Sequence, residues 1–256
     1  MHIVLFVVLA VGGLFAGMLL LQEAGRRLGT RRLRVDPEGS RAGLGAVEGA
    51  VFGVMGLLIA FTFSGAASRF DTRRHLIVEE ANAIGTAYLR IDLLPPEGQP
   101  KIRELFRAYA DARIAVYRKL PDVAAAEPEL QRSIALRAQI WKASLEAAAG
   151  APQATRLLLP ALNAMFEIAT ARTVALQTHP PAIIFAMLGL VALACSLLAG
   201  YAMAGTKQRS LVHGLGFALI LTLTVYVILD IEYPRVGLVR INAMDQLLTD
   251  VRQNMR

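Results

Sequence analysis

Residues Leu44 to Ala66 read LGAVEGAVFGVMGLLIAFTFSGA, an apolar run in which Glu48 is the single charged residue. A helix needs roughly 20 predominantly apolar residues to cross the hydrocarbon core of a bilayer. Three further runs of this kind cover residues 3–21, 182–204 and 211–231. The sequence therefore predicts an all-α membrane protein with four transmembrane helices, two on each side of a helical-bundle insert.

The predicted helices divide the chain into four segments. They are the first two transmembrane helices with an Arg-rich link (1–68), the extramembrane helical-bundle insert (69–180), the third and fourth transmembrane helices (181–232) and a C-terminal amphipathic tail (233–256). No proline interrupts residues 63–94, so the second transmembrane helix is expected to continue into the insert.

Within the insert, prolines separate stretches in which apolar residues recur every three or four positions, the pattern of packed helices. The roughest of these stripes comprises Leu130, Ile134, Trp141 and Leu145. No stretch alternates with period two for long enough to predict a strand. We therefore expect four helical elements in the insert.

The composition limits the possible partners. Hydrophobic residues make up 55% of the chain, and many of the basic residues behind its net charge of +7 lie beside the apolar runs. Basic residues at the ends of transmembrane helices act as topology signals and contact anionic lipids. We therefore expect the lipid bilayer, and not nucleic acid, to be the partner of these charges.

The single cysteine and the first apolar run bear on disulfide bonding and on signal-peptide cleavage. Cys195 is the single cysteine and lies in the third run, so no intramolecular disulfide is possible. The first run is longer than the apolar part of a typical signal peptide, and no Lys or Arg precedes it. It is expected to be a retained transmembrane helix.

The basic residues also predict an orientation. The link at residues 22–43 is rich in arginine, and the short link between the third and fourth runs carries Lys207 and Arg209. Short basic loops favour the cytoplasmic side. This predicts a multi-pass protein of the bacterial cytoplasmic (inner) membrane with the insert on the extracytoplasmic side.

Small residues form one stripe along the second transmembrane helix: Gly45, Gly49, Gly53, Gly56 and Ala60. Glycines at this spacing let two helix backbones approach closely in lipid. The simpler interpretation is packing against another helix of the same chain. The alternative is association with further copies of the chain around a symmetry axis.

Charged residues near the membrane have two interpretations each. Glu48 could pair with Arg41 in the headgroup region or lie at a pore mouth. A second group of charges is predicted at the opposite membrane face, as ordinary helix-end anchors or as a vestibule that selects ions. It comprises Arg69, Arg73, Arg74, Asp230, Glu232 and Arg235.

Three stretches carry a resemblance to a known family. They are GLLIAFTFSGAASRFDTRR at 56–74, EEANAIGTAYLRIDLLPP at 79–96 and VYVILDIEYPRVGLVRI at 225–241. With them, nearly the whole chain resembles a bacterial family of membrane proteins with a bestrophin-like domain.

Bestrophins themselves are pentameric anion channels whose second transmembrane helix lines the pore at a hydrophobic neck. The resemblance implies pore-lining roles for residues on one face of that helix: Leu57, Phe61, Ser64 and Ser68. No bestrophin neck motif aligns residue by residue, however. The helical region of bestrophins is also cytoplasmic, which conflicts with the orientation predicted from charge.

Two functions therefore compete. The first is a homo-oligomeric ion channel, or anion-conducting pore, lined by the second transmembrane helix and pentameric if it follows bestrophins. The alternative is a membrane-anchored helical module for interaction, sensing or assembly, favoured by the scarcity of polar residues deep in the spans. No catalytic or metal-binding motif is present, so we expect no enzyme activity, no cofactor and no metal site.

Overall fold

The computed structural model describes residues 2–36, 44–205 and 211–255, and these contain no strand. The all-α fold class is therefore confirmed. Four helical segments are long and apolar enough to cross a membrane. In chain order the helices are α1 (His2–Val35), α2 (Leu44–Leu89), η2 (Arg90–Leu93), α3 (Gln99–Lys119), α4 (Val123–Ala147), α5 (Pro152–Gln177), α6 (Ala182–Ala202), η3 (Met203–Gly205), α7 (Leu211–Glu232), η4 (Asn242–Asp245) and α8 (Gln246–Gln253).

The chain divides into two compact units. The first comprises Met1–Ser68 and His179–Leu238, and the second comprises Arg69–Thr178 and Val239–Arg256. The second unit thus includes most of the C-terminal segment, which the sequence suggested as a separate tail. Helix α2 continues from the first unit into the second without a break, as the absence of proline predicts.

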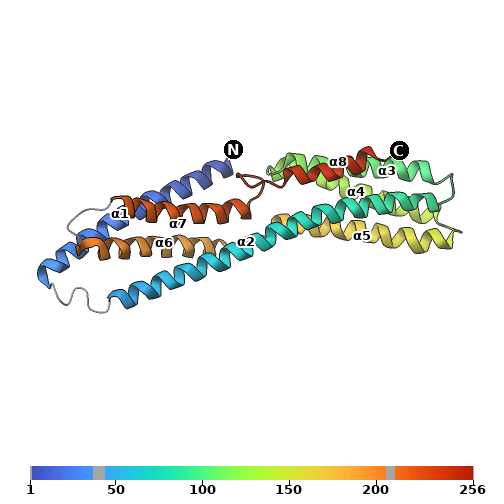
Figure 1. The fold of residues 1–256 in the computed structure, drawn as a ribbon. Coiled ribbons are helices and arrows are strands. Elements are labelled where there is room, and N and C mark those ends of the chain that lie inside the picture. Colours follow the sequence, from blue (N-terminus) through green and yellow to red (C-terminus); the bar gives the residue numbers. More distant parts are fainter. Residues whose placement is uncertain (1, 37–43, 206–210, 256) are drawn as a thin grey trace. The chain divides into compact units, whose positions relative to one another are not determined.

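In the first unit, α1 packs closely along α6, and α7 packs against both (Figure 1). Glycine permits this close approach. A Cβ atom built on Gly25 would lie 2.0 Å from the carbonyl oxygen of Leu197, and one built on Gly200 would lie 2.0 Å from that of Gln22. The amide of Gln22 donates a hydrogen bond to the carbonyl oxygen of Gly214 at 3.2 Å, which joins α1 to α7.

The second unit is a helical bundle whose helix ends follow from the sequence. Pro100 lies in the first turn of α3, where its missing N–H is not needed. Asp122 caps α4 by accepting a hydrogen bond from the backbone N–H of Ala125 at 3.0 Å. Pro152 begins α5. The core of the bundle comprises residues such as Ile84, Phe106, Tyr109, Ile140 and Leu158.

The stripe predicted on α4 is only partly correct, because Leu130 and Trp141 pack against the core but the other two residues do not. Ile134 is 40% exposed and Leu145 is 51% exposed, whereas Leu136 and Ile140 are buried in the core. The remaining buried positions of α4 are small residues, alanines and serines such as Ser144. The predicted stripe therefore included two exposed residues and omitted two large core residues, Leu136 and Ile140.

The C-terminal segment closes one side of the bundle. Helix α8 packs on α3, and Leu248 and Met255 are 2% and 5% exposed within the core. At the surface, the guanidinium of Arg252 donates to both carboxylate oxygens of Asp111, at 2.8 and 3.0 Å. The segment is therefore anchored by apolar burial and by charge pairing.

Candidate pore helix and a buried charge cluster

The part of α2 in the first unit packs on its own chain through one face. This face carries Val51, Phe52, Met55 and Ala66, and the last two are 2% and 0% exposed. The ring of Phe52 meets that of Phe217 edge to face, with centroids 6.0 Å apart. These contacts fix which side of α2 faces the remaining helices of the unit.

The residues implied as pore-lining lie on the opposite side of α2. At 3.6 residues per turn, their face is roughly 150° around the helix from the packed face. Leu57 is 59% exposed and Phe61 is 73% exposed, and Ser64 and Ser68 are also exposed. A large apolar side chain such as Phe61 is thus presented away from its own chain, toward lipid or another subunit.

The glycine stripe of α2 also lacks a partner among the described residues. No atom lies within 4 Å of a Cβ built on Gly45, Gly49, Gly53 or Gly56, and Ala60 is exposed. The described chain therefore does not show the same-chain packing that was the simpler interpretation. Close glycine contacts exist elsewhere in this unit, between α1 and α6, so the α2 stripe is a separate surface.

Glu48 lies on the packed side of α2, far around the helix from Leu57. Its carboxylate oxygen Oε1 is buried and accepts no hydrogen bond from any residue that the structure describes. The pairing considered with Arg41 falls outside the described residues. Because it lies opposite the Leu57 face, Glu48 does not belong to the proposed pore lining.

In the first unit, the acidic residues at the end of α7 stabilise the turn that follows it. A carboxylate oxygen of Asp230 accepts a hydrogen bond from the backbone N–H of Leu238 at 2.9 Å. Glu232 is fully buried and lies 2.9 Å from Nδ1 of His179, whose ring stacks on Tyr233. These contacts assign both acids a structural role.

In the second unit, the three predicted arginines differ in environment. Arg73 is 3% exposed and donates to the backbone carbonyls of Ala175 and Thr178, at 3.1 and 2.9 Å. Arg74 is exposed, whereas Arg69 is half-buried, as is Arg235 in the first unit. Arg73 thus anchors α2 to the end of α5.

The sequence analysis missed a buried charge cluster in the second unit. Glu80, on α2, accepts hydrogen bonds from Nε of Arg113 at 2.6 Å, from Nη1 of Arg172 at 2.6 Å and from the hydroxyl of Tyr117 at 2.9 Å. The side chains of Glu80, Arg113 and Arg172 are at most 2% exposed. Arg172 also pairs with Asp245 of η4.

The cluster balances two buried guanidinium groups against two carboxylates. The guanidinium carbon of Arg172 lies 3.4 Å from the centroid of the Tyr117 ring, a cation–π arrangement. Burial raises the pKa of the Tyr117 hydroxyl, and the negative charge of Glu80 raises it further. Tyr117 is therefore a neutral hydrogen-bond donor, and the cluster links α2, α3, α5 and the C-terminal segment.

Helical periodicity could have revealed this cluster. Glu80, Arg113 and Arg172 each lie three or four positions from apolar residues of a core-facing stripe, and charged residues at such positions are almost always paired. The neighbouring stripe residues are Ile77, Ile84, Tyr109, Val116, Ala169 and Leu176. The sequence could not show that the three charges converge, because that depends on how the helices pack.

Among the described residues, no group of three or more His, Cys, Asp or Glu side chains is placed to hold a metal ion. His75 and Glu79 instead form an exposed pair one helical turn apart, 3.0 Å between Nε2 and Oε1. The features that stand out are thus the unpartnered surface of α2 and the buried charges of the bundle.

Four membrane-length helices and a helical insert define the class: an all-α, multi-pass membrane protein. A family model described as the Bestrophin-like domain matches residues 12–244, and the chain belongs to this family. No curated protein sequence matches the chain.

Solved structures share the fold. A bacterial bestrophin homologue from Klebsiella pneumoniae, in a tryptophan-to-alanine variant, superposes with a TM-score of 0.66 at 13% identity over 96% of each chain. A zinc-phased structure of a homologue from the same organism gives 0.64 at 14% identity, over 93% of this chain and 96% of that one. A structure described as a membrane protein, with a proline-to-alanine substitution, gives 0.59 at 14% identity over 94% and 97%.

Proposed function

We propose that this chain assembles into a homo-oligomeric, anion-conducting pore lined by α2. The observation that carries the proposal is the exposed face of Leu57, Phe61, Ser64 and Ser68, which points away from the chain's own helices. Apolar side chains followed by hydroxyls suit a narrow neck that opens into a wetter region. The family resemblance, which implies a pore on the second transmembrane helix, agrees with this assignment.

The glycine stripe supports contact between copies of the chain. Glycine gains nothing from facing lipid, but it lets a second helix approach its backbone closely. The stripe at Gly49 and Gly53 lies roughly a quarter-turn around α2 from the proposed pore face. In a closed ring of α2 helices, one face lines the centre while a neighbouring face contacts the next subunit. The two surfaces of α2 fit this arrangement, with five subunits as the expected number.

Charge favours anions over cations. After Glu48, the next charged residue along α2 is Arg69, directly after the proposed pore face. A positive rim raises the local concentration of anions. Arg73 is excluded from this rim because it is committed to backbone carbonyls of its own unit. Arg69 and the exposed Arg74 are the residues we assign to it, and the charge of Arg74 is shared with Asp71, 3.7 Å away on the same helix.

The test combines subunit counting with flux. Native mass spectrometry of the purified protein should show a closed oligomer, and liposomes that contain it should pass chloride. Phe61→Ala should change the conductance. Leu190→Ala is the matched control, because Leu190 is a similarly exposed apolar residue on α6. A monomer or dimer, or liposomes that remain impermeable at all applied potentials, would eliminate the pore.

The second candidate is a membrane-anchored helical module without a pore. It is favoured by hydroxyls that bond within their own helices. Thr62 donates to the carbonyl oxygen of Leu58 at 2.6 Å, and Thr224 donates to that of Ile220 at 2.9 Å. Such hydroxyls need no water and suit a dry bundle. A specific protein partner that co-purifies with a monomeric, impermeable chain would favour this function.

We further propose that the chain lies in the bacterial cytoplasmic membrane, in contact with anionic lipids, with the helical insert outside. Cys195 is buried, so a cysteine introduced at exposed Ala124 provides a specific label. A membrane-impermeant maleimide should modify the Ala124→Cys variant in intact cells. Labelling only after lysis would place the insert in the cytoplasm.

A further inference from the structure

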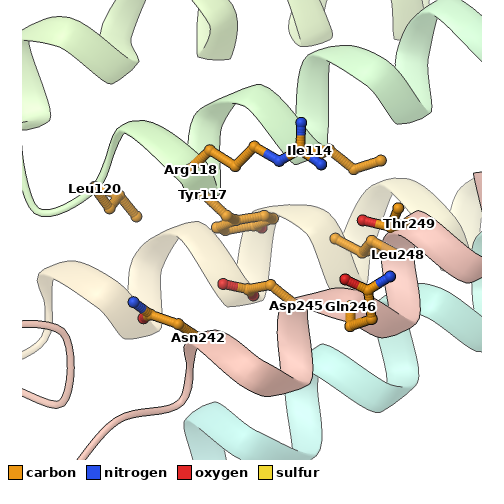
Figure 2. A pocket seen from close by; sticks show the side chains of 9 residues that line it. All are labelled: Ile114, Tyr117, Arg118, Leu120, Asn242, Asp245, Gln246, Leu248 and Thr249. Carbon is orange, nitrogen blue, oxygen red and sulfur yellow. The ribbon is translucent and has the colours of Figure 1, made fainter.

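A pocket lies between α3 and the C-terminal segment of the second unit. Its volume is about 250 Å³, and its walls include Ile114, Tyr117 and Arg118 of α3 with Asn242, Gln246 and Thr249 of the C-terminal segment. Figure 2 shows the side chains of the two segments facing the same space, with the Tyr117 ring between them. The pocket thus combines an apolar floor with polar groups around its edge.

Arg118 gives the pocket an uncompensated positive charge. It is exposed and makes no ion pair or hydrogen bond with any residue that the structure describes. Its neighbours differ, since Lys119 pairs with Glu129 and Arg252 pairs with Asp111. The other charged residue of the lining, Asp245, is paired with the buried Arg172.

We propose that this pocket binds a small organic monocarboxylate through Arg118. A guanidinium matches a carboxylate with two parallel hydrogen bonds. The hydroxyl of Thr249, in the same lining, supplies a further donor. The negative charge of Asp245 in the same lining disfavours phosphate and other multiply charged anions.

The pocket also offers an apolar surface to the aliphatic part of the ligand. Ile114, Leu248 and the Tyr117 ring form the hydrophobic surface of the pocket. An adjoining hollow of about 360 Å³ shares Ile114, Arg118 and Thr249 with it. A short aliphatic chain attached to the carboxylate can therefore lie along α3 beside these side chains.

Binding in this pocket would hold the C-terminal segment on the bundle, because its two walls come from these two parts of the unit. The ligand would bridge them beside the pairing of Asp245 with Arg172. A molecule that binds only the docked state stabilises that state by mass action. The segment 242–255 should consequently exchange its backbone amide hydrogens more slowly when the ligand is bound.

The test uses the full chain in nanodiscs, with sodium butyrate as the probe and butyramide as its uncharged counterpart. Butyrate should bind saturably and slow hydrogen exchange in 242–255, whereas butyramide and phosphate should do neither. Arg118→Gln should weaken butyrate binding roughly tenfold or more, since it removes a charge-assisted hydrogen-bonded pair. Arg132→Gln is the matched control, because this exposed α4 arginine lies outside the pocket.

Three outcomes would overturn the proposal: no saturable butyrate binding, equal binding by the Arg118→Gln variant, or phosphate binding as tight as that of butyrate. Arg118 is exposed, so its replacement should leave the fold intact, and an unchanged melting temperature checks this. The inference does not depend on conduction. If the protein is impermeable but binds butyrate, the proposed pore is wrong and the proposed binding site stands.

Discussion

Replacing Glu80 with glutamine removes the negative charge that Arg113 and Arg172 share inside the helical bundle. The side chain of Glu80 is fully buried and accepts three hydrogen bonds, two of them from guanidinium groups at 2.6 Å. Glutamine keeps the shape of the side chain but leaves two buried positive charges facing only Asp245. The perturbation is therefore electrostatic, with little change in packing.

The expected cost follows from this geometry. Removal of one partner from a buried ion pair destabilises a protein by about 3–5 kcal/mol, because an uncompensated charge remains in a low-dielectric interior. At about 2–4 °C per kcal/mol for a chain of this length, the bundle should melt roughly 6–20 °C lower than in the wild type. Arg113→Met added to Glu80→Gln should recover part of this loss, since Arg172 and Asp245 then balance.

The assay is thermal unfolding followed by tryptophan fluorescence. Trp141 is the chain's only tryptophan and packs against the bundle core, so it reports on this unit. Glu79→Gln is the matched control, because Glu79 is adjacent in sequence but partly exposed, and it pairs with the exposed His75. A Glu80→Gln protein that melts within a degree or two of wild type would refute the reasoning, as would a double variant less stable than the single one.

Three further predictions follow from the packing and the charges. Gly53→Leu should break the oligomer into smaller species in native mass spectrometry, whereas Gly12→Leu, at another open glycine, should not. Gly200→Ala should abolish folding of the first unit, measured as loss of monodisperse protein, because its Cβ would meet the carbonyl of Gln22. Because the pKa of Tyr117 is raised, its contribution to stability is full below the ordinary value of 10.0 and falls at higher pH, so Tyr117→Phe should lose stability less steeply in alkaline unfolding.

The sequence was sufficient for the membrane class because membrane crossing is a local requirement. An apolar run such as 44–66 must form a helix in lipid, where each backbone polar group needs a partner within its own segment. The continuity of α2 was equally predictable, since no proline interrupts it. The stripe on α4 was only half correct, because Leu130 and Trp141 pack on the core whereas the exposed Ile134 and Leu145 were chosen in place of the buried Leu136 and Ile140.

The buried charge cluster could be predicted only in part from the sequence. Glu80, Arg113 and Arg172 each stood on an apolar stripe, so their burial was within reach of periodicity. Their convergence was not, because they lie on three helices separated by tens of residues in the chain. Docking of the C-terminal segment, which brings Asp245 to Arg172, depends on the same packing.

The surface of α2 shows most directly what the sequence determines and what the tertiary structure determines. The sequence by itself determined that Gly49 and Phe61 lie on different faces of one helix, since 3.6 residues per turn fix their angular positions. Only the tertiary structure decided that Phe52 and Met55 pack on the chain's own helices while the faces of Gly49 and Phe61 remain exposed. The physical reason is that helical periodicity specifies faces, whereas the choice of a partner for each face depends on the complementary surfaces of helices distant in sequence.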